Sequence, residues 1–493
     1  WDAILAVSRD ELNKQLEQQY VERHQQLSFL PPFNGAVALD EQAVEVVKLQ
    51  GVQLGVPSIS MLAADSSSVT VTMSLAAGRY TRTHQPAGGA PAVSGSFKII
   101  EAMGFRVEMR VPLQVDGEGN VTMDLTEGSD FTCNLSGVDE PVNVLLAGFF
   151  ANEFKQIAWH RAVFVLLGVD LNRYTAQSPA SFRVVTQSAP GARNAEARNF
   201  GEGALVLLIR MRGGHGDGQF PLSSDFTYPI PANPKARLGQ SYGASLILSR
   251  EMRCSEGQDR PPLLDSLRFG SGAPFAAPAT CVADDLLMFG TFEAPQASIT
   301  PLFSTIMAGQ TQSFTLRDAQ GQPIAANNWQ VISLQGHNPV VHGMITSSGV
   351  YSVTQMGHDA LRVVVTATYD DGGKTRTASA LLGVVSEPME IAPRVMVVAG
   401  GALVQPVLLK ATALDGTQVG LALQGTEAGT LSEVDGGMLF TPDARSGKRI
   451  LSTQQLSVEG EEKRLATVLI ANGKQALRIE PASVPRAPKG APV

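Results

Sequence analysis

Two stretches of the sequence place apolar residues at the spacing of an α-helix. Near the N-terminus, Ser8 and Glu11 form a capping box, in which each side chain satisfies a free backbone N–H of the first helical turn. Pro31 and Pro32 mark the end of this helix, because proline lacks the N–H that a helix interior needs. The apolar stripe between these signals is Leu12, Leu16, Tyr20 and Leu27.

The second helical stretch begins at Asp139 and Pro141, residue types that are typical of a helix cap and of the first helical turn. Its apolar stripe is wide and contains three phenylalanines: Val142, Leu145, Leu146, Phe149, Phe150, Phe154 and Ile157. Both stretches therefore predict helices that bury one face.

Other segments alternate apolar and polar residues, which is the period of a β-strand with one buried face. The longest alternation runs over 105–115, and the turn Asp116-Gly-Glu-Gly-Asn120 joins it to a second alternating segment at 121–125, which predicts a β-hairpin. Further strands are predicted at 69–73, 181–188, 204–212 and 244–249. Long strands together with two helices predict an α+β fold for this part of the chain.

Beyond residue 297 the pattern changes to short strands, and the sequence weakly repeats itself. Ile299-Thr-Pro301 returns as Ile391-Ala-Pro393, about 90 residues later. The segment 343–351 is echoed by Gly429-Thr-Leu-Ser and Gly437-Met-Leu-Phe440. Each copy also carries a pair of alternating strands, at 361–369 with 377–385 and at 455–458 with 465–470. Repeats of this length, built from short strands, predict two β-sandwiches.

These patterns divide the chain into three domains and a tail. We expect an α+β domain over 1–292, one β-sandwich over 293–387 and a second, degenerate sandwich over 388–480. Four prolines fall within 481–493, which predicts an unpacked tail. The length of 493 residues agrees with roughly three domains.

Composition narrows the class of protein. Hydrophobic residues make up 44% and charged residues 17% of the chain, so large cores are expected and general disorder is excluded. The net charge is −8 and no basic cluster stands out, which excludes nucleic acid as the main partner. The longest apolar runs, such as Ala204–Ile209, are far shorter than a membrane-spanning helix, and no signal peptide is visible.

No motif in the sequence forms a recognisable catalytic or cofactor site. Gly373-Lys-Thr375 matches the end of a phosphate-binding loop, but Thr368 occupies the first glycine position and the motif lies between two strands, so a hairpin turn is favoured. The glycine-rich segment 213–218 lacks the spacing of a nucleotide-binding loop and predicts a surface loop. We therefore expect no cofactor and no resident metal.

The remaining polar candidates are weak. None of the seven histidines forms a metal-ligand pattern, and no GxSxG nucleophile motif occurs. Asp284-Asp285 and Asp370-Asp371 offer too few oxygens for a calcium site by themselves and are typical of turns. The three cysteines form no CxxC pair; Cys254 and Cys281 are either buried thiols or a disulfide, and buried thiols are favoured.

The two apolar helical stripes are the main functional signal, and they allow two interpretations. In the first, both helices close the core against the sheet. In the second, they border an apolar groove for a lipid-like ligand, since each buried methylene contributes about 0.8 kcal/mol. The residues that would line this groove are Leu12, Leu16, Tyr20, Phe149, Phe150 and Phe154.

The N-terminal region resembles the tubular lipid-binding (TULIP) superfamily, and within it the accessory proteins encoded beside botulinum-type neurotoxins. The resemblance lies in Trp1-Asp2, in Ser8 followed by Leu12-Asn13, and in Tyr228-Pro-Ile-Pro231 before the apolar strand Ala244–Ser249. It implies a long helix wrapped by a curved antiparallel sheet, binding to lipid or membrane, and no enzymatic activity.

The C-terminal region resembles bacterial immunoglobulin-like domains of the intimin and invasin type. The resemblance lies in Gly343, in Ser348-Gly-Val-Tyr351 and in Val363-Val-Val-Thr-Ala-Thr368, with Phe440-Thr-Pro442 at the tyrosine position of the second copy. Such domains act as spacers or adhesive surfaces, often outside the cytoplasm, so the resemblance favours a secreted or cell-surface location.

The sequence therefore predicts a non-enzymatic protein that binds lipid or membrane, such as an accessory protein of a bacterial toxin system, with a protein partner. One alternative is a structural or adhesive protein-interaction module without a small ligand. A second alternative is a hydrolase whose site is assembled from distant residues around His160 or His215.

Overall fold

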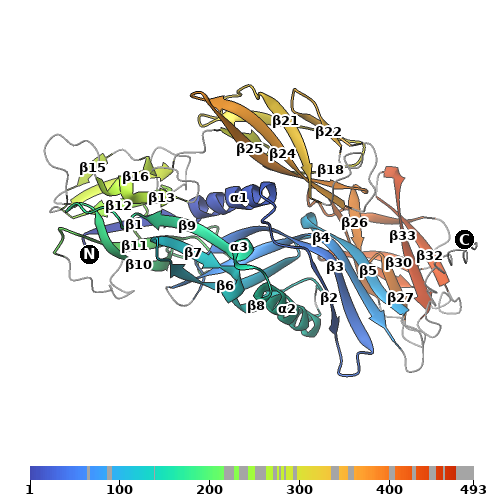
Figure 1. Ribbon diagram of the computed structural model, residues 1–493. Coiled ribbons are helices and arrows are strands. Elements are labelled where there is room, and N and C mark those ends of the chain that lie inside the picture. The colour runs from blue at the N-terminus through green and yellow to red at the C-terminus, as the bar shows by residue number, and fades with distance from the viewer. Residues whose placement is uncertain are drawn as a thin grey trace, which may run out of the picture. The chain divides into compact units, whose positions relative to one another are not determined.

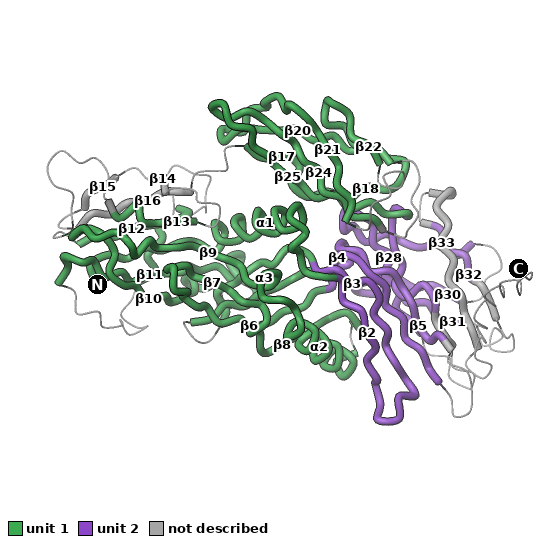
Figure 2. The backbone as a smooth tube through the Cα atoms, in the orientation of Figure 1, with its two compact units in different colours: residues 1–31, 55–74, 106–386 green, residues 32–54, 75–105, 387–493 purple. Residues whose placement is uncertain are grey.

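The chain forms two compact units, each assembled from segments that are distant in sequence (Figure 2). The structure, a computed structural model, describes residues 1–63, 67–85, 92–137, 139–215, 227–231, 242–249, 252, 262–269, 275–276, 279–282, 285–292, 297–334, 343–353, 360–398, 406–424, 429–442, 451–458 and 461–472. Unit 1 comprises 1–31, 55–74 and 106–386, and unit 2 comprises 32–54, 75–105 and 387–493. The linear domains expected from the sequence stay a prediction, and the tail 481–493 lies outside the described residues.

The first sheet of unit 1 is organised around β1 (Ala3–Ser8), an apolar strand at the start of the chain. β1 pairs antiparallel with β11 on one edge and with β12 on the other, and its side chains from Leu5 to Val7 are fully buried. The strand order is β10-β11-β1-β12-β16-β14, and β15 also pairs with β16. The bounds are Pro179–Ser188 for β10, Gly203–Met211 for β11, Ala244–Leu248 for β12, Phe275–Ala276 for β14, Ala279–Val282 for β15 and Asp285–Phe292 for β16. The strands predicted at 181–188, 204–212 and 244–249 are thus confirmed.

The described residues contain three α-helices, α1 (Arg9–Gln25), α2 (Glu140–Lys155) and α3 (Trp159–Ala162), all in unit 1 (Figure 1). Half of the capping box predicted for α1 is confirmed, because the backbone N–H of Glu11 donates to Ser8 Oγ at 3.3 Å. The other half is not formed: the N–H of Ser8 donates to the Gly243 carbonyl at 2.8 Å, and the Glu11 carboxylate pairs with Lys14. α2 follows Asp139 and carries a proline in its first turn, also as predicted.

A second sheet of unit 1 runs in the order β13-β9-β7-β6-β4, and β8 pairs with β6. The predicted hairpin is confirmed as β6 and β7, and Asp116 Oδ1 closes its turn by accepting hydrogen bonds from the N–H groups of Glu118 and Asn120. β4 joins this sheet through Ser68–Ser74. The bounds are Ser68–His84 for β4, Arg106–Val115 for β6, Asn120–Asp124 for β7, Ser129–Cys133 for β8, Val163–Val169 for β9 and Leu267–Phe269 for β13. The short 3-10 helices beside it are η2 (Leu125–Glu127) and η4 (Pro262–Ser266).

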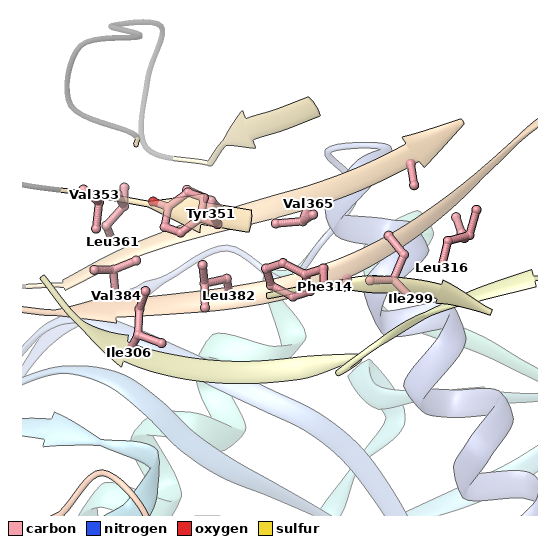
Figure 3. Packing of buried hydrophobic residues seen from close by; sticks show 14 of the residues in the cluster. Ile299, Ile306, Phe314, Leu316, Tyr351, Val353, Leu361, Val365, Leu382 and Val384 are labelled. Carbon is pink, nitrogen blue, oxygen red and sulfur yellow. The ribbon is translucent and has the colours of Figure 1, made fainter. Parts of the chain in front are cut away.

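The predicted first β-sandwich is present in unit 1, between residues 297 and 385. Its strands pair in the orders β17-β20, β18-β25-β24-β21 and β19-β23-β22, and they enclose one apolar core around the fully buried Tyr351 (Figure 3). β18 and β25, near the start and at the end of the sandwich, pair in parallel. The bounds are Ala297–Thr300, Phe303–Met307, Thr311–Ser313, Thr315–Asp318, Asn328–Ser333, Met344–Ile345, Val350–Ser352, Ala360–Asp371 and Lys374–Val385 for β17 to β25 in chain order.

The second sandwich lies in unit 2 and repeats this arrangement. The strand order β27-β33-β32-β29 matches β18-β25-β24-β21, and β27 again pairs in parallel with β33. A second sheet, β26-β28-β31-β30, completes a core around Phe440, and the Ala392–Pro393 bond is cis like Thr300–Pro301. The predicted repeat is therefore confirmed. The bounds are Met389–Ala392, Val395–Val398, Val407–Ala413, Leu421–Gln424, Gly429–Val434, Gly437–Pro442, Leu451–Val458 and Glu461–Asn472 for β26 to β33 in chain order.

In unit 2, the second sandwich shares a sheet with strands from the first hundred residues. β5 (Ala92–Ile100) pairs with β4 through Ala77–His84 on one edge and with β27 on the other. β3 (Glu45–Ser60) pairs with β4 and with β2 (Phe33–Ala38), and η1 (Glu101–Met103) follows β5. The sequence pattern did not indicate this joint sheet.

The α+β, TULIP-like class predicted for residues 1–292 is wrong, because this part of the chain is mostly β-strand and its two longer helices have only 17 and 16 residues. Two of the motifs on which the TULIP resemblance rested, Trp1-Asp2 and the strand that contains Ser245, form hydrogen bonds in the first sheet of unit 1. Asp2 accepts a hydrogen bond from the backbone N–H of Met211 at 2.8 Å, and Ser245 Oγ in β12 donates to the Pro229 carbonyl at 2.7 Å. Among the described helices, none is both long and apolar enough to cross a membrane.

Candidate functional site

The structure buries five of the six side chains that the sequence placed along an apolar groove. Leu12, Leu16 and Tyr20 on α1 and Phe150 and Phe154 on α2 are buried, and Phe149 is half-buried. The two helices pack on different elements: α1 on β1, β9 and β11, and α2 on β8 and η2. The groove itself stays a prediction, and no contact of the described side chains adds support for lipid binding.

Tyr20 is in contact with protein rather than facing open space. It packs with Val21 of α1 against Val364 and Leu381 of the first sandwich. Its hydroxyl accepts a hydrogen bond from Arg362 Nη1 at 2.8 Å. Ser379 Oγ also lies 2.6 Å from Gln25 Oε1, so polar contacts accompany the apolar ones where α1 meets β24 and β25.

The polar candidates of the sequence analysis are not brought into a catalytic cluster within the described residues. His160 and His215 are both exposed. Among the described residues, no group of three or more His, Cys, Asp or Glu side chains could hold a metal ion. A surface histidine of unit 2, His84, does lie 3.7 Å from Glu45, but the same carboxylate is ion-paired with Arg82.

Several other candidates have structural roles. Gly373 lies in the turn between β24 and β25, and Lys374 and Thr375 begin β25, as the hairpin interpretation predicted; Asp371 at the end of β24 pairs with Arg376 at 2.6 Å. Cys133 is a buried free thiol whose pKa burial raises to about 11. The side chains of Cys254 and Cys281, the residue Asp284 and the histidines 337, 342 and 358 lie outside what the structure describes.

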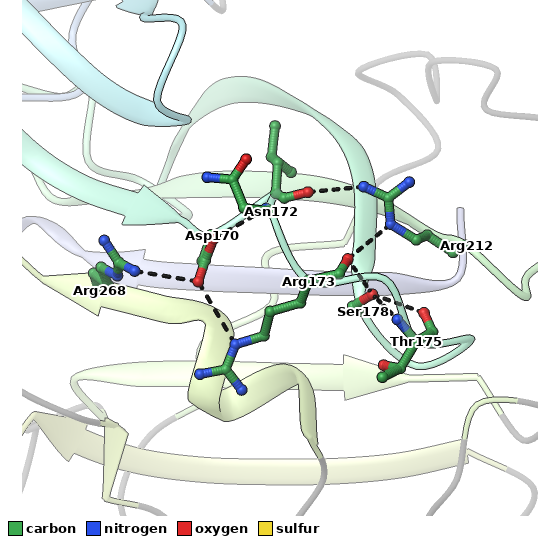
Figure 4. Close-up of polar contacts among 8 residues, drawn as sticks. Asp170, Asn172, Arg173, Thr175, Ser178, Arg212 and Arg268 are labelled. Carbon is green, nitrogen blue, oxygen red and sulfur yellow. Dashed lines mark hydrogen bonds and ion pairs between the residues drawn. The ribbon is translucent and has the colours of Figure 1, made fainter.

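The described surface holds a cluster that the sequence analysis did not single out, in the loop 170–178 that follows β9 (Figure 4). Asp170 begins the loop: its Oδ1 accepts the backbone N–H of Asn172 at 3.0 Å, and its Oδ2 lies 3.2 Å from Arg268 Nη2 and 3.6 Å from Arg173 Nε. The hydrogen bond from Asn172 and the two guanidinium groups lower the pKa of Asp170 below its usual value. The carboxylate therefore anchors two arginines at neutral pH.

Arg212, which directly follows β11, holds the loop through hydrogen bonds to two of its carbonyl groups. Its Nε donates to the Arg173 carbonyl at 2.8 Å and its Nη2 to the Leu171 carbonyl at 2.7 Å. The same guanidinium lies over the ring of Tyr174, 4.1 Å from the ring centre. Ser178 Oγ, close to the carbonyls of Arg173 and Thr175, completes the internal hydrogen bonding.

This arrangement holds an exposed aromatic ring against the guanidinium of Arg212, in a loop whose Asp170 is paired with Arg173 and Arg268. Tyr174 is 81% exposed, although the backbone around it is hydrogen-bonded on both sides. Tyrosine and arginine are the residue types that contribute most to protein–protein binding, and a preformed loop loses little conformational entropy when a partner binds. The loop is chemically suited to a protein surface that presents carboxylates.

Sequence reasoning missed this loop because its partners are remote. Arg212 lies 39 residues beyond Arg173, and Arg268 lies 98 residues beyond Asp170. The only local signal is Asp170-Leu-Asn172, an Asx-type turn that follows an apolar strand. That signal indicates a turn but no binding surface.

Comparison with known proteins adds no assignment. No protein-family model matches the sequence, and no curated protein matches it. Among solved structures, the human desmocollin-1 ectodomain is similar with 13% identity and a TM-score of 0.20, over 62% of this chain and 54% of that chain.

Two further solved structures show likeness of the same strength. The endo-fucoidan hydrolase of glycoside hydrolase family 107 has 12% identity and a TM-score of 0.15, over 42% of this chain and 40% of that chain. Domains 5–6 of the S-layer protein SbsC have 14% identity and a TM-score of 0.14, over 40% of this chain and all of that chain. The chain thus spans about half or less of the hydrolase and the desmocollin, and at these TM-scores the likenesses carry no argument about function.

Proposed function

We propose that this chain is a non-enzymatic protein-interaction protein, in which β-sheets and sandwiches carry binding loops on their surface. The observation that supports the proposal is the loop 170–178, where Tyr174 is held exposed against the guanidinium of Arg212 and where Asp170 is paired with Arg173 and Arg268. This is the structural or adhesive alternative of the sequence analysis, made specific to one surface.

The charge of the loop indicates the kind of partner. Asp170 is largely buried and balances only part of the charge of the three arginines, in a chain whose net charge is −8. A local positive surface on an acidic protein favours an acidic partner and speeds its encounter at low salt. We infer that the partner is a protein with clustered aspartate and glutamate side chains.

The proposal is tested by the double substitution Tyr174→Ala with Arg173→Ala. The unchanged full chain and the double variant are each used to capture proteins from an extract of the source cells, at low and at moderate salt. Quantitative mass spectrometry then compares the captured proteins. We expect an acidic protein whose recovery falls with salt and whose affinity drops on the order of tenfold or more in the double variant, as for loss of an aromatic and arginine anchor.

The matched control is Phe200→Ala with Arg198→Ala, which removes an exposed aromatic and an exposed arginine from another loop. This control is expected to retain the same partner at the same level as the unchanged chain. Equal recovery with both double variants would show that the loop 170–178 is not the binding surface. Turnover of an ester, phosphate or glycoside substrate that is lost on changing His160 or His215 would instead favour the hydrolase alternative.

A further inference from the structure

The N-terminal half of the outer face of α2 is apolar although it faces solvent, whereas Asn152 and Lys155 are exposed on its C-terminal half. The inner face packs on β8 and η2 through Val142, Leu146 and Phe150, among others. On the opposite side, Val144 is 68% and Leu145 40% exposed, and Pro141 and Gly148 are exposed beside them. The N-terminal half of this face, around Val144 and Leu145, therefore has the composition of a contact surface.

Gly148 in the middle of this face has no internal explanation. A Cβ atom at this position would meet nothing within 4 Å, so the fold of the chain does not require a glycine there. Glycine in a helix interior lowers helix stability relative to alanine. A glycine on an outer helical face does, however, permit the close approach of another backbone.

The charges at the two ends of α2 complement each other. Glu140, in the first turn, and Lys155, in the last turn, are both exposed. If two α2 helices cross antiparallel at Gly148, residue 141 lies opposite residue 155 of the other helix, which brings each Glu140 next to a Lys155. The same antiparallel arrangement places the positive end of each helix dipole beside the negative end of the other.

We infer that α2 is the contact surface of a symmetric dimer, in which a second copy of this chain packs its α2 antiparallel across Gly148. Such a two-fold contact is self-complementary, since the same apolar face and the same pair of end charges occur on both sides. One helix per subunit forms a small interface, so the dimer is weak and reversible. This inference concerns self-association and is independent of the partner proposed for the loop 170–178.

The test is sedimentation of the full chain over roughly 1–200 μM, a range in which weak dimers dissociate. The unchanged chain is expected to shift from monomer to dimer as its concentration rises. Gly148→Leu is expected to weaken the dimer at least about tenfold, because its side chain occupies the crossing point. Gly117→Leu, the same change at another exposed glycine with nothing within 4 Å of its Cβ, is the control and is expected to dimerise normally.

Charge reversal tests the antiparallel arrangement. Glu140→Lys and Lys155→Glu are each expected to weaken the dimer, on the order of tenfold, and the two together to restore much of the loss. Circular dichroism of each variant confirms that α2 remains folded. A monomer at every concentration, or a dimer that Gly148→Leu leaves unchanged, would overturn the proposal. If the dimer of the double variant were no tighter than the dimers of the two single variants, the antiparallel packing would be overturned.

Discussion

At the scale of single residues, two glycines explain the motif that repeats in the sandwiches. Gly343 has a φ of +74°, and a Cβ there would lie 2.5 Å from Tyr351 Oη. At Gly429 a Cβ would lie 2.7 Å from Cζ of Phe440, the equivalent buried aromatic residue. In both repeats a glycine thus leaves room for the aromatic ring at the centre of the core, which gives the motif Gly…Tyr or Gly…Phe a steric cause.

We predict that Gly343→Ala destabilises the first sandwich by about 2–4 kcal/mol, from left-handed backbone strain and overpacking together. Gly372→Ala is the control, because Gly372 also has a positive φ but nothing within 4 Å of its Cβ. The control should lose only the backbone contribution, about 1–2 kcal/mol. Hydrogen exchange of the β24 amides measures both losses, and equal effects would contradict the steric explanation.

A second residue of interest is Glu390, a carboxyl group only 2% exposed in β26. Burial raises its pKa to about 7, although Arg394 and the backbone N–H of Lys98 oppose the shift. Glu387, which faces the same group, adds to the increase. In the unfolded chain the same carboxyl ionises near pH 4.5, so the folded form holds its proton to a higher pH.

We predict that the second sandwich becomes less stable as the pH rises from about 5 to about 8. Ionised Glu390 is penalised by burial in the folded state alone, so stability is greatest where both states are protonated and falls as pH passes through the folded pKa. Glu390→Gln should remove most of this dependence and stabilise the sandwich at pH 8. The measurement is thermal unfolding of the unchanged chain and of Glu390→Gln at about pH 5 and about pH 8. If the stability of both proteins changed equally between these pH values, Glu390 would not cause the pH dependence.

At the scale of elements, sequence signals predicted the features that depend on neighbouring residues, such as helix caps and hairpin turns. The Ser8 cap of α1 and the β6–β7 hairpin follow from neighbouring residues, and both are present. β1 was missed because Ala3–Val7 is a short apolar run without alternation, which a strand paired on both edges does not need. The pairing of β5 with β27 and the anchors of the loop 170–178 join residues far apart in sequence, and no periodicity records such contacts.

The overturned fold class has a related cause. Most positions of the two helical stripes are buried, but Leu27 lies beyond the end of α1 and is 56% exposed, and Leu145 is 40% exposed. A stripe predicts which face of a helix is buried, but it does not identify the element that covers that face. α1 and α2 each cover part of a β-rich unit rather than forming the long axis of a tubular domain. The groove residues were therefore predicted as buried apolar positions, whereas the surface loop, with its polar anchors, left no apolar pattern to detect.

At the scale of the molecule, unit 2 depends on both ends of its discontinuous sequence. In β27, Val395 and Met396 pair with Ser96 and Gly95 of β5, and Arg394 donates its backbone N–H to the Ser96 carbonyl at 3.0 Å. A chain that stops at Ser386 would leave this edge of β5 unpaired. Unpaired strand edges exchange their amide hydrogens quickly and template association with other strands.

We predict that the chain truncated after Ser386 shows faster amide exchange in β5 and aggregates with rising concentration, whereas the full chain does not. Hydrogen exchange with mass spectrometry and light scattering measure the two effects. Addition of residues 387–493 as a separate polypeptide serves as the control and should slow the exchange in β5. Unchanged protection of β5 in the truncated chain would mean that its pairing with β27 contributes little.

The parallel pairing of β18 with β25, and of β27 with β33, has a mechanical consequence. In each sandwich, tension applied at the start of the first of these strands and at the end of the last pulls two parallel strands in opposite directions. All hydrogen bonds between them are then loaded together in shear, whereas an antiparallel pair pulled from the same end opens one bond at a time. Both repeats are thus arranged to resist stretching along the chain, which is the load that a protein carries when it tethers one body to another.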